Sequence, residues 1–281
     1  MKKIKLVVCM MAISLYTFGQ IVHNDTVNHC TMTTYAGILG GPVQSVENES
    51  LTTPTTLRVG GMIQWKPNSW SSLYGLGAVE ANQTGTISPF SLLGVTLSPI
   101  KSVTITLGKI ATPMTKLRPL PITGSGQFES WTVSQIPGSA IGGSITGSFS
   151  KEYSLSAGSF VRGSDVSVEA GLGIPYTQIA GYYMANSRKF GGAINCNYKL
   201  LSTTLMYNSE KNAGMFDAVK ISQKHNLFLY SDIGFSINNW NMVRGEWGVF
   251  KTFSVQYLSS ILGVGYSKEI KSVKGYVFIH L

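Results

Sequence analysis

Charged residues are scarce in this chain of 281 residues, because Asp, Glu, Lys and Arg make up only 12% of it. A typical soluble domain carries about 25%. Long apolar runs that could form transmembrane helices are also missing after residue 20, since the longest uncharged stretches contain many glycines and serines or are broken by proline. The 31 glycines disfavour a helix bundle, and the 11% of aromatic residues disfavours intrinsic disorder. These features favour a β-rich chain that tolerates few charges.

Groups for catalysis and metal binding are few. The chain has four histidines, and none stands near a serine nucleophile in a recognisable motif. Neither G-x-S-x-G, H-E-x-x-H nor a P-loop occurs, and the three cysteines form no C-x-x-C motif or Cys/His cluster. We therefore expect no enzymatic activity, no metal ion and no other cofactor.

The N-terminus has the three parts of a secretory signal peptide. Residues 1–5 are basic, residues 6–18 form an apolar segment, and the small residues Thr17 and Gly19 stand at the positions that a signal peptidase needs. We expect residues 1–20 to be removed, with cleavage after Gly19 or Gln20, and residues 21–281 to form the mature protein. The alternative, a membrane anchor, is disfavoured because the apolar segment is too short to span roughly 30 Å. The ending Phe18-Gly19-Gln20 is similar to signal peptides of the Bacteroidetes.

Loss of the signal peptide removes three lysines and lowers the formal net charge from +9 to +6. The remaining basic residues are scattered singly, so we expect no nucleic-acid partner. Two cysteines, Cys30 and Cys196, remain in an oxidising compartment, which permits one disulfide. We favour two isolated cysteines.

The rest of the chain alternates apolar with small or polar residues in runs of about ten, which is the period of a β-strand. Aromatic residues stand near run ends, including Trp65, Trp70, Tyr176 and Phe250, as in the interfacial belts of membrane barrels. The mid-run charges all fall on the polar face, namely Arg58, Glu80, Glu169, Asp232, Arg244 and Glu246. Because this face is small and sparsely charged, the pattern predicts a transmembrane antiparallel β-barrel with apolar residues toward lipid and polar residues toward a water-filled lumen.

We count sixteen strands, and fourteen or twelve remain alternatives. Their centres are predicted near Thr34, Met62, Leu76, Leu93, Ile105, Ile145, Ala157, Val168, Gly181, Ile194, Leu205, Val219, Ile233, Gly245, Tyr257 and Val277. The run around Tyr257 continues to Tyr266 and is compatible with two strands. If the mature chain starts in the periplasm, the third outer connection is residues 111–138, an exceptionally long segment without alternation.

This long segment resembles part of a porin-type family of Gram-negative outer-membrane barrels. The resemblance lies in Gly108–Met114, Leu117-Arg118-Pro119, Gln127-Phe128-Glu129 and Ile136-Pro137-Gly138. It implies a third outer loop that folds into the lumen and narrows it, and it implies a homotrimer.

A constriction needs fixed charges along a narrow water path. The charges inside the long loop are Lys116, Arg118 and Glu129, and the candidates on the lumen wall are Arg58, Glu169, Asp232, Arg244 and Glu246. If Arg118 faces Arg58 or Arg244 with Glu129 opposite, a transverse field results. The alternative is an exposed loop whose charges are solvated.

The sequence therefore predicts a porin-like channel in the bacterial outer membrane, in contact with lipid and open to passive diffusion of small hydrophilic solutes or ions. One alternative is a non-conducting structural or secretion-associated barrel that binds a partner through its loops. Another is a soluble exported β-sandwich. The wall candidates include acids and arginines, so the sequence does not assign an ion preference.

Overall fold

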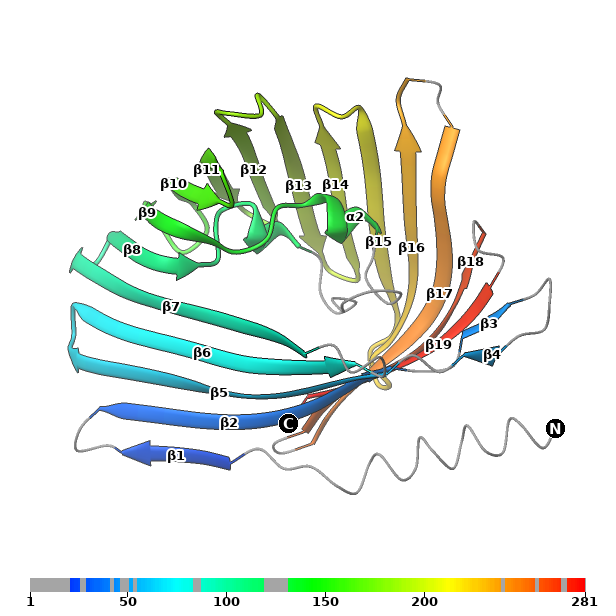
Figure 1. Ribbon diagram of the computed structural model, residues 1–281, viewed down its shortest axis with the longest axis horizontal. Coiled ribbons are helices and arrows are strands. Elements are labelled where there is room, and N and C mark those ends of the chain that lie inside the picture. Colours follow the sequence, from blue (N-terminus) through cyan, green and yellow to red (C-terminus); the bar gives the residue numbers. More distant parts are fainter. Residues whose placement is uncertain are drawn as a thin grey trace.

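A computed structural model describes residues 21–25, 29–40, 43–45, 51–52, 55–82, 87–118, 131–238, 241–255, 258–268 and 272–280. Nineteen strands belong to one sheet, and two short helices lie in the connection between β8 and β9 (Figure 1). The strands are β1 (Ile21–Asp25), β2 (Cys30–Gly40), β3 (Val43–Ser45), β4 (Leu51–Thr52), β5 (Thr55–Asn68), β6 (Ser71–Asn82), β7 (Ile87–Ile100), β8 (Val103–Ile110), β9 (Ala140–Ser148), β10 (Ser154–Arg162), β11 (Asp165–Ile174), β12 (Thr177–Met184), β13 (Phe190–Tyr198), β14 (Leu201–Asn208), β15 (Asn212–Ser222), β16 (Leu227–Ser236), β17 (Asn241–Val255), β18 (Leu258–Ser267) and β19 (Ser272–His280). The helices are the 3-10 turn η1 (Thr115–Leu117) and α2 (Trp131–Gln135).

Sixteen of the described strands pair in a ring. From β5 to β19 each strand pairs antiparallel with the next in sequence, β2 pairs with β5, and β19 pairs back to β2 through Val277↔Gly40 to His280↔Gly37. The strands β3 and β4 extend the connection between β2 and β5, where β3 also pairs with β19. Closing the sheet in this way provides backbone partners between neighbouring strands, as a sheet in hydrocarbon requires. Residues 87–92 of β7 extend past the end of β8 and pair only with β6.

The short strand β1 completes the seam between the two ends of the chain. It pairs with residues 30–34 of β2, while β19 pairs with residues 37–40 of the same strand. The other edge of β2 is occupied along its whole length by β5. β1 therefore continues the line of β19 along β2 and covers the part of β2 that β19 does not reach.

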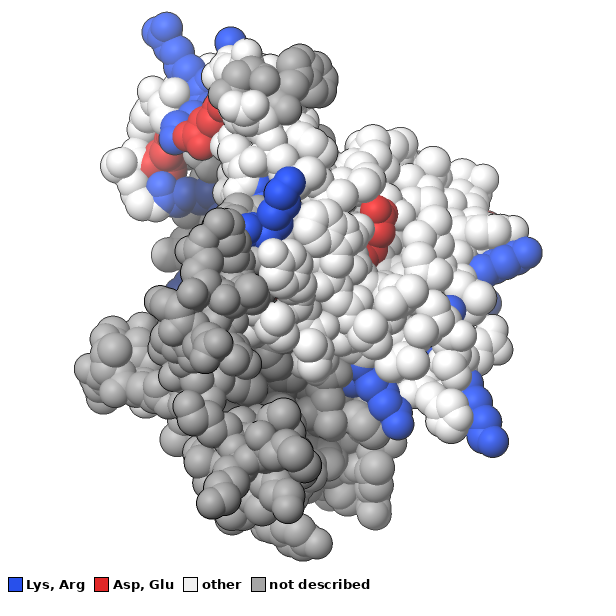
Figure 2. Space-filling model, turned by 90° about the vertical axis from the view of Figure 1, so that its right-hand side faces the viewer, with Lys and Arg blue, Asp and Glu red and all other residues white. Residues whose placement is uncertain are grey.

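The two faces of the sheet have the inverted polarity that the sequence predicts. In β11, Asp165, Ser167 and Glu169 are buried, whereas Val166 and Val168 on the opposite face are exposed. The same inversion holds for the other described charges that were assigned to the polar face, because Asp232, Arg244 and Glu246 all lie on the inner face. On the face drawn in Figure 2, most of the described surface carries neither acidic nor basic residues.

A few charged residues lie on the outer face. Lys109 and Lys251 stand near strand ends, opposite Leu93 and Leu227 respectively. Asp217 lies further inside its strand, between the register partners Thr203 and Ser231. The rule that charges face inward therefore holds for the residues the pattern assigned and not for every charge in the barrel.

Three of the aromatic residues predicted for the interfacial belts lie on the exposed surface near turns, namely Trp65, Trp70 and Tyr176. The prediction for Phe250 is wrong. It is 1% exposed on the inner face, where its ring stacks on Phe228 with centroids 4.7 Å apart. The register of β17 with β16 sets this orientation, because Phe250 is the direct partner of Phe228.

Fifteen of the sixteen predicted strand centres fall inside strands of the ring. The exception is Tyr257, which lies outside the described residues between β17 and β18. The two cysteines are free, as expected: Cys30 lies in β2 and Cys196 in β13. No helix within the described ranges is long and apolar enough to cross a membrane.

The orientation of the strands can be tested by placing one arginine on either face of β9. Ile145 is 51% exposed on the outer face, and Ser144 is its neighbour on the inner face. We expect Ile145→Arg to lower the free energy of unfolding in lipid vesicles by about 2–4 kcal/mol, because it places a guanidinium in hydrocarbon. The control Ser144→Arg should cost clearly less. Equal costs would contradict the assignment of the two faces.

Candidate functional site

The connection between β8 and β9 folds against the inner face of the barrel. Its described parts are residues 111–118 and 131–139. η1 contacts β12 and β13, while α2 contacts β14, β15 and β16. We call these two parts the inner loop. It crosses the ribbon in front of β12–β15 in Figure 1.

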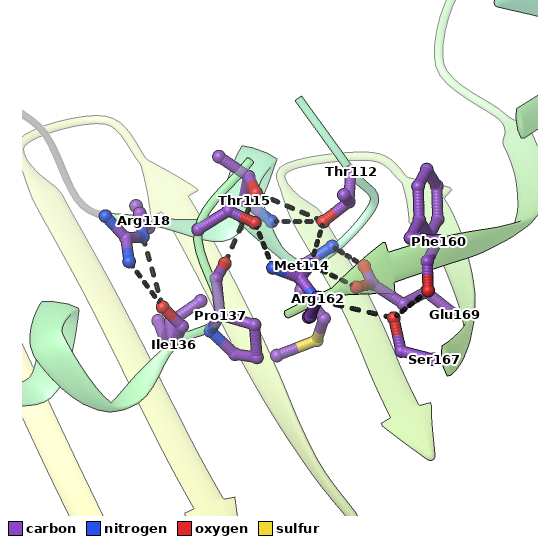
Figure 3. A network of polar contacts seen from close by, with 11 residues as sticks. Thr112, Met114, Thr115, Arg118, Ile136, Pro137, Phe160, Arg162, Ser167 and Glu169 are labelled. Carbon is purple, nitrogen blue, oxygen red and sulfur yellow. Dashed lines mark hydrogen bonds and ion pairs between the residues drawn. The ribbon is translucent and has the colours of Figure 1, made fainter. Parts of the chain in front are cut away.

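The first anchor of the inner loop is the carboxylate of Glu169 on β11 (Figure 3). Its side chain is completely buried. Oε2 accepts a hydrogen bond of 3.1 Å from the backbone N–H of Met114, and Oε1 pairs with Arg162 of β10. The carboxylate thus joins the barrel wall to the start of the loop.

Arg162 extends this anchor to the end of the loop. Its Nη1 donates to the carbonyl of Gly138 at 2.5 Å, and its Nη2 donates to the hydroxyl of Thr112 at 3.2 Å. Nε also donates to Ser167 of β11 at 3.3 Å. One guanidinium therefore holds both the outgoing and the returning segments of the loop against β10 and β11.

The two segments are also tied to each other. Arg118 donates from Nη2 and Nε to the carbonyl of Ile136, at 2.6 and 3.2 Å. The hydroxyl of Thr115 donates to the carbonyl of Pro137 at 3.3 Å. Figure 3 shows these bonds bridging the segment with η1 and the segment that follows α2.

The second anchor is Asp232 of β16, which binds the first turn of α2. Its Oδ2 accepts the backbone N–H of Trp131 at 2.5 Å. Its Oδ1 accepts the backbone N–H and the hydroxyl of Thr132, at 3.2 and 2.6 Å. Because the first N–H groups of a helix have no partner within the helix, this carboxylate serves as a cap supplied by the barrel wall.

Between the anchors, apolar side chains of the loop pack on the wall. Met114, Leu117 and Ile136 are 1–2% exposed and form one cluster with small or flexible wall residues. The wall contributes Ala180 of β12, Ala193 of β13 and Met206 of β14, with Tyr182 and Trp131 packed against the cluster. This burial stabilises the loop through the hydrophobic effect at a place where a water-filled barrel would otherwise be polar.

Two glycines make room for the indole of Trp131. A Cβ at Gly234 of β16 would lie 2.5 Å from a ring carbon of Trp131, and a Cβ at Gly214 of β15 would lie 2.7 Å from the hydroxyl of Thr132. Both distances are shorter than side-chain atoms tolerate, so only glycine allows this close approach. The glycines of the inner face thus shape the surface on which α2 lies.

The wall beside the inner loop carries a row of neighbouring aromatic rings and an ion pair. Phe216 and Tyr230 stack at 6.1 Å, and Tyr230 lies 6.0 Å from Phe250. The hydroxyl of Tyr230 donates to Glu246 at 2.9 Å, and Arg244 pairs with the other oxygen of Glu246 at 2.6 Å. Hydrogen bonds and packing therefore fix this part of the wall as well.

The positions of Glu169 and Asp232 differ from the expectation of wall charges along a water path. Both residues lie on the inner face, but they are 0% and 1% exposed because the inner loop covers them. Arg244 and Glu246 pair with each other. The sequence pattern places these residues on the correct face, and it does not reveal what covers them.

The loop charges are arranged differently from the predicted transverse field. Arg118 turns back to the carbonyl of Ile136, whereas Lys116 is exposed on η1. Glu129 and the side chain of Arg58 lie outside the described residues, and the backbone register places Arg58 opposite Glu80 of β6. No group of three or more potential metal ligands occurs in the described part of the chain.

Sequence reasoning missed Arg162, Trp131 and Thr132, which hold the loop. The alternation of β10 continues to Arg162 and could have placed it on the inner face beside the predicted Glu169. The roles of Trp131 and Thr132 have no signal in the strand pattern, because they follow from the path of the loop.

Comparison with known proteins adds evidence on the fold. The sequence matches no family model and no curated protein. Among solved structures, a triple mutant of Rh. blastica porin is similar over 89% of this chain and 99% of its own, with a TM-score of 0.57 and 9% identity. A structure entitled "Asymmetric conductivity of engineered proteins" is similar over 90% and 99%, with a TM-score of 0.56 and 9% identity. The chain therefore has the fold of a porin, a transmembrane antiparallel β-barrel.

The contribution of the second anchor can be measured with Asp232→Ala. We expect the free energy of unfolding to fall by about 2–4 kcal/mol, because three donors lose a charged acceptor. Urea unfolding in vesicles measures this change. The control Glu210→Ala removes an exposed pair with Lys189 and should cost at most about 1 kcal/mol. An equally small effect of both variants would contradict the anchoring role of Asp232.

The fit of Trp131 on the wall can be tested with Gly234→Ala. We expect a loss of about 1–3 kcal/mol, because the added methyl group overlaps the indole ring. Gly77→Ala is the control, since a Cβ there meets nothing within 4 Å. The double variant Gly234→Ala with Trp131→Ala should lose less than the sum of the single variants. Additive losses would show that the methyl group and the indole do not meet.

Proposed function

We propose that the protein is a bacterial outer-membrane channel through which small hydrophilic solutes or ions diffuse passively. The observation that carries this proposal is the inner loop, which occupies one side of the barrel interior and is anchored at Glu169 and Asp232. A sixteen-strand barrel is wide enough to leave an aqueous channel. A loop fixed on its wall narrows that channel without closing the full cross-section.

The anchoring explains why such a constriction keeps its shape. The carboxylates of Glu169 and Asp232 lie on β11 and β16, with four strands between them. The apolar cluster fills the interval between the two anchors. A loop held at two separated points by buried, charge-assisted hydrogen bonds presents a fixed outline to passing solutes.

We further propose how the channel is exported, oriented and assembled. Residues 1–20 serve as an export signal, the long loop starts from the outer side of the membrane, and the mature barrel lies in the outer membrane. The protein acts without a catalytic step and without a cofactor. A homotrimer is the assembly in which we expect it.

A second candidate function is a non-conducting barrel that binds a partner through its loops. It is favoured by the aromatic rings of the inner wall, where Phe216, Tyr230 and Phe250 are at most 5% exposed and fill space inside the barrel. The two candidates differ in whether a water path remains beside the inner loop. Ion conductance separates them.

The channel can be tested with the refolded protein in planar bilayers, beside a variant that lacks residues 116–130. We expect discrete conductance steps from the wild type and larger steps from the deletion variant, because the deletion removes Leu117, which packs on the wall, and Arg118, which ties the two segments of the inner loop together. Glu210→Ala, on an outer turn, should leave the step size unchanged. Heat-modifiable migration on a gel would confirm that each variant is folded. A folded wild-type barrel without conductance would contradict the channel and favour the partner-binding barrel.

A further inference from the structure

Every acidic side chain described on the inner face is buried and engaged. Glu169 binds Arg162 and the loop backbone, and Glu246 binds Arg244 and Tyr230. Asp232 accepts three hydrogen bonds from α2. Asp165, at the end of β11, accepts the backbone N–H groups of residues 166, 186 and 187 at 2.8–3.0 Å. Their exposed fractions are 9% or less, so none presents a free carboxylate to solutes.

Two lysines of the same interior have no carboxylate partner among the described residues. Lys116 is exposed on η1, next to Leu117, which packs on the wall. It forms no ion pair with any described residue. Lys220 of β15 is half-buried on the inner face, where its ammonium lies 5.5 Å from the ring centroid of Phe228, and it too forms no ion pair within the described ranges.

From this asymmetry we infer that the channel prefers anions, and that Lys116 and Lys220 set the preference. The inference rests on the proposed channel function and specifies the class of solute that it favours. Two of the buried carboxylates, Glu169 and Asp232, bind the inner loop, and Glu246 and Asp165 bind groups of the barrel wall and its turns. The accessible charge among the described residues is positive. An anion in the water path meets ammonium groups, and a cation meets no accessible carboxylate of the described wall.

The two lysines occupy different heights of the lumen. Lys116 belongs to the loop that enters from one end of the barrel, and Lys220 stands two residues before the last residue of β15, close to the turn that leads to β16. Positive charges at two levels favour anion entry and anion passage past the constriction. Because low-dielectric walls focus the field of fixed charges, single residues have a measurable effect on selectivity.

The experiment measures the reversal potential of the wild-type protein in planar bilayers under a KCl gradient. We expect the sign that corresponds to chloride being more permeant than potassium. The preference should grow as the ionic strength is lowered, because screening of the fixed charges weakens. Lys116→Glu with Lys220→Glu should lower the ratio of chloride to potassium permeability by about fivefold or more.

The control variant is Lys224→Glu, which makes the same change of charge on an exposed turn four residues from Lys220. It should leave the permeability ratio close to that of the wild type. The single variants Lys116→Gln and Lys220→Gln keep the test valid if the double variant does not fold. Each should lower the ratio by a smaller factor.

The possible outcomes distinguish a failure of the anion preference from a failure of the channel. Conductance with a cation preference, or a ratio that the lysine variants do not change, overturns the anion preference and leaves the channel intact. A folded barrel without conductance overturns the channel and the anion preference together. An anion preference that falls with both lysine variants and not with Lys224→Glu supports the inference.

Discussion

The fold depends on the requirement that each backbone N–H and C=O of a sheet in hydrocarbon finds a partner within the sheet. Closure of the ring from β2 through β5 to β19 meets this requirement along most of the sheet, and the short strand β1 pairs with part of β2 that β19 leaves open. Closure has a second consequence. With lipid outside, the apolar side chains of each strand face outward, and the polar ones face the interior.

An interior of polar side chains does not by itself hold a loop in place. The inner loop is held because a few positions of the inner face carry apolar residues or glycine in place of polar residues. Ala180, Ala193 and Met206 provide an apolar surface, and Gly214 and Gly234 provide room for Trp131. Glu169 and Asp232 then accept backbone N–H groups that would otherwise be buried without partners. Packing and hydrogen bonding thus act at the same place, which explains why a short helix such as α2 is stable there.

The barrel could be predicted from the sequence because apolar and polar residues alternate in every strand, and this alternation occurs in many strands along the chain. Even β11, with Glu169 at its centre, shows the correct face. The burial and the partners of Glu169 could not be predicted. Met114 is distant from it in the sequence, and Arg162 belongs to a different strand, β10. The inward path of residues 111–118 and 131–138 was available only as a resemblance. Phe250 was misassigned because a position near the end of a run does not reveal the register.

The charge of the lumen follows from the way in which the loop is anchored. A loop that lies on a wall must have acceptors for its unpaired N–H groups, and carboxylates are the strongest acceptors among side chains. Once Glu169 and Asp232 take this role they are buried, and their charge is no longer accessible to solutes. Lysine cannot accept a hydrogen bond, so Lys116 and Lys220 cannot take this role, and neither pairs with a carboxylate of the described residues. Among the described residues of the inner face, the hydrogen bonds that hold the inner loop therefore leave the accessible charge positive.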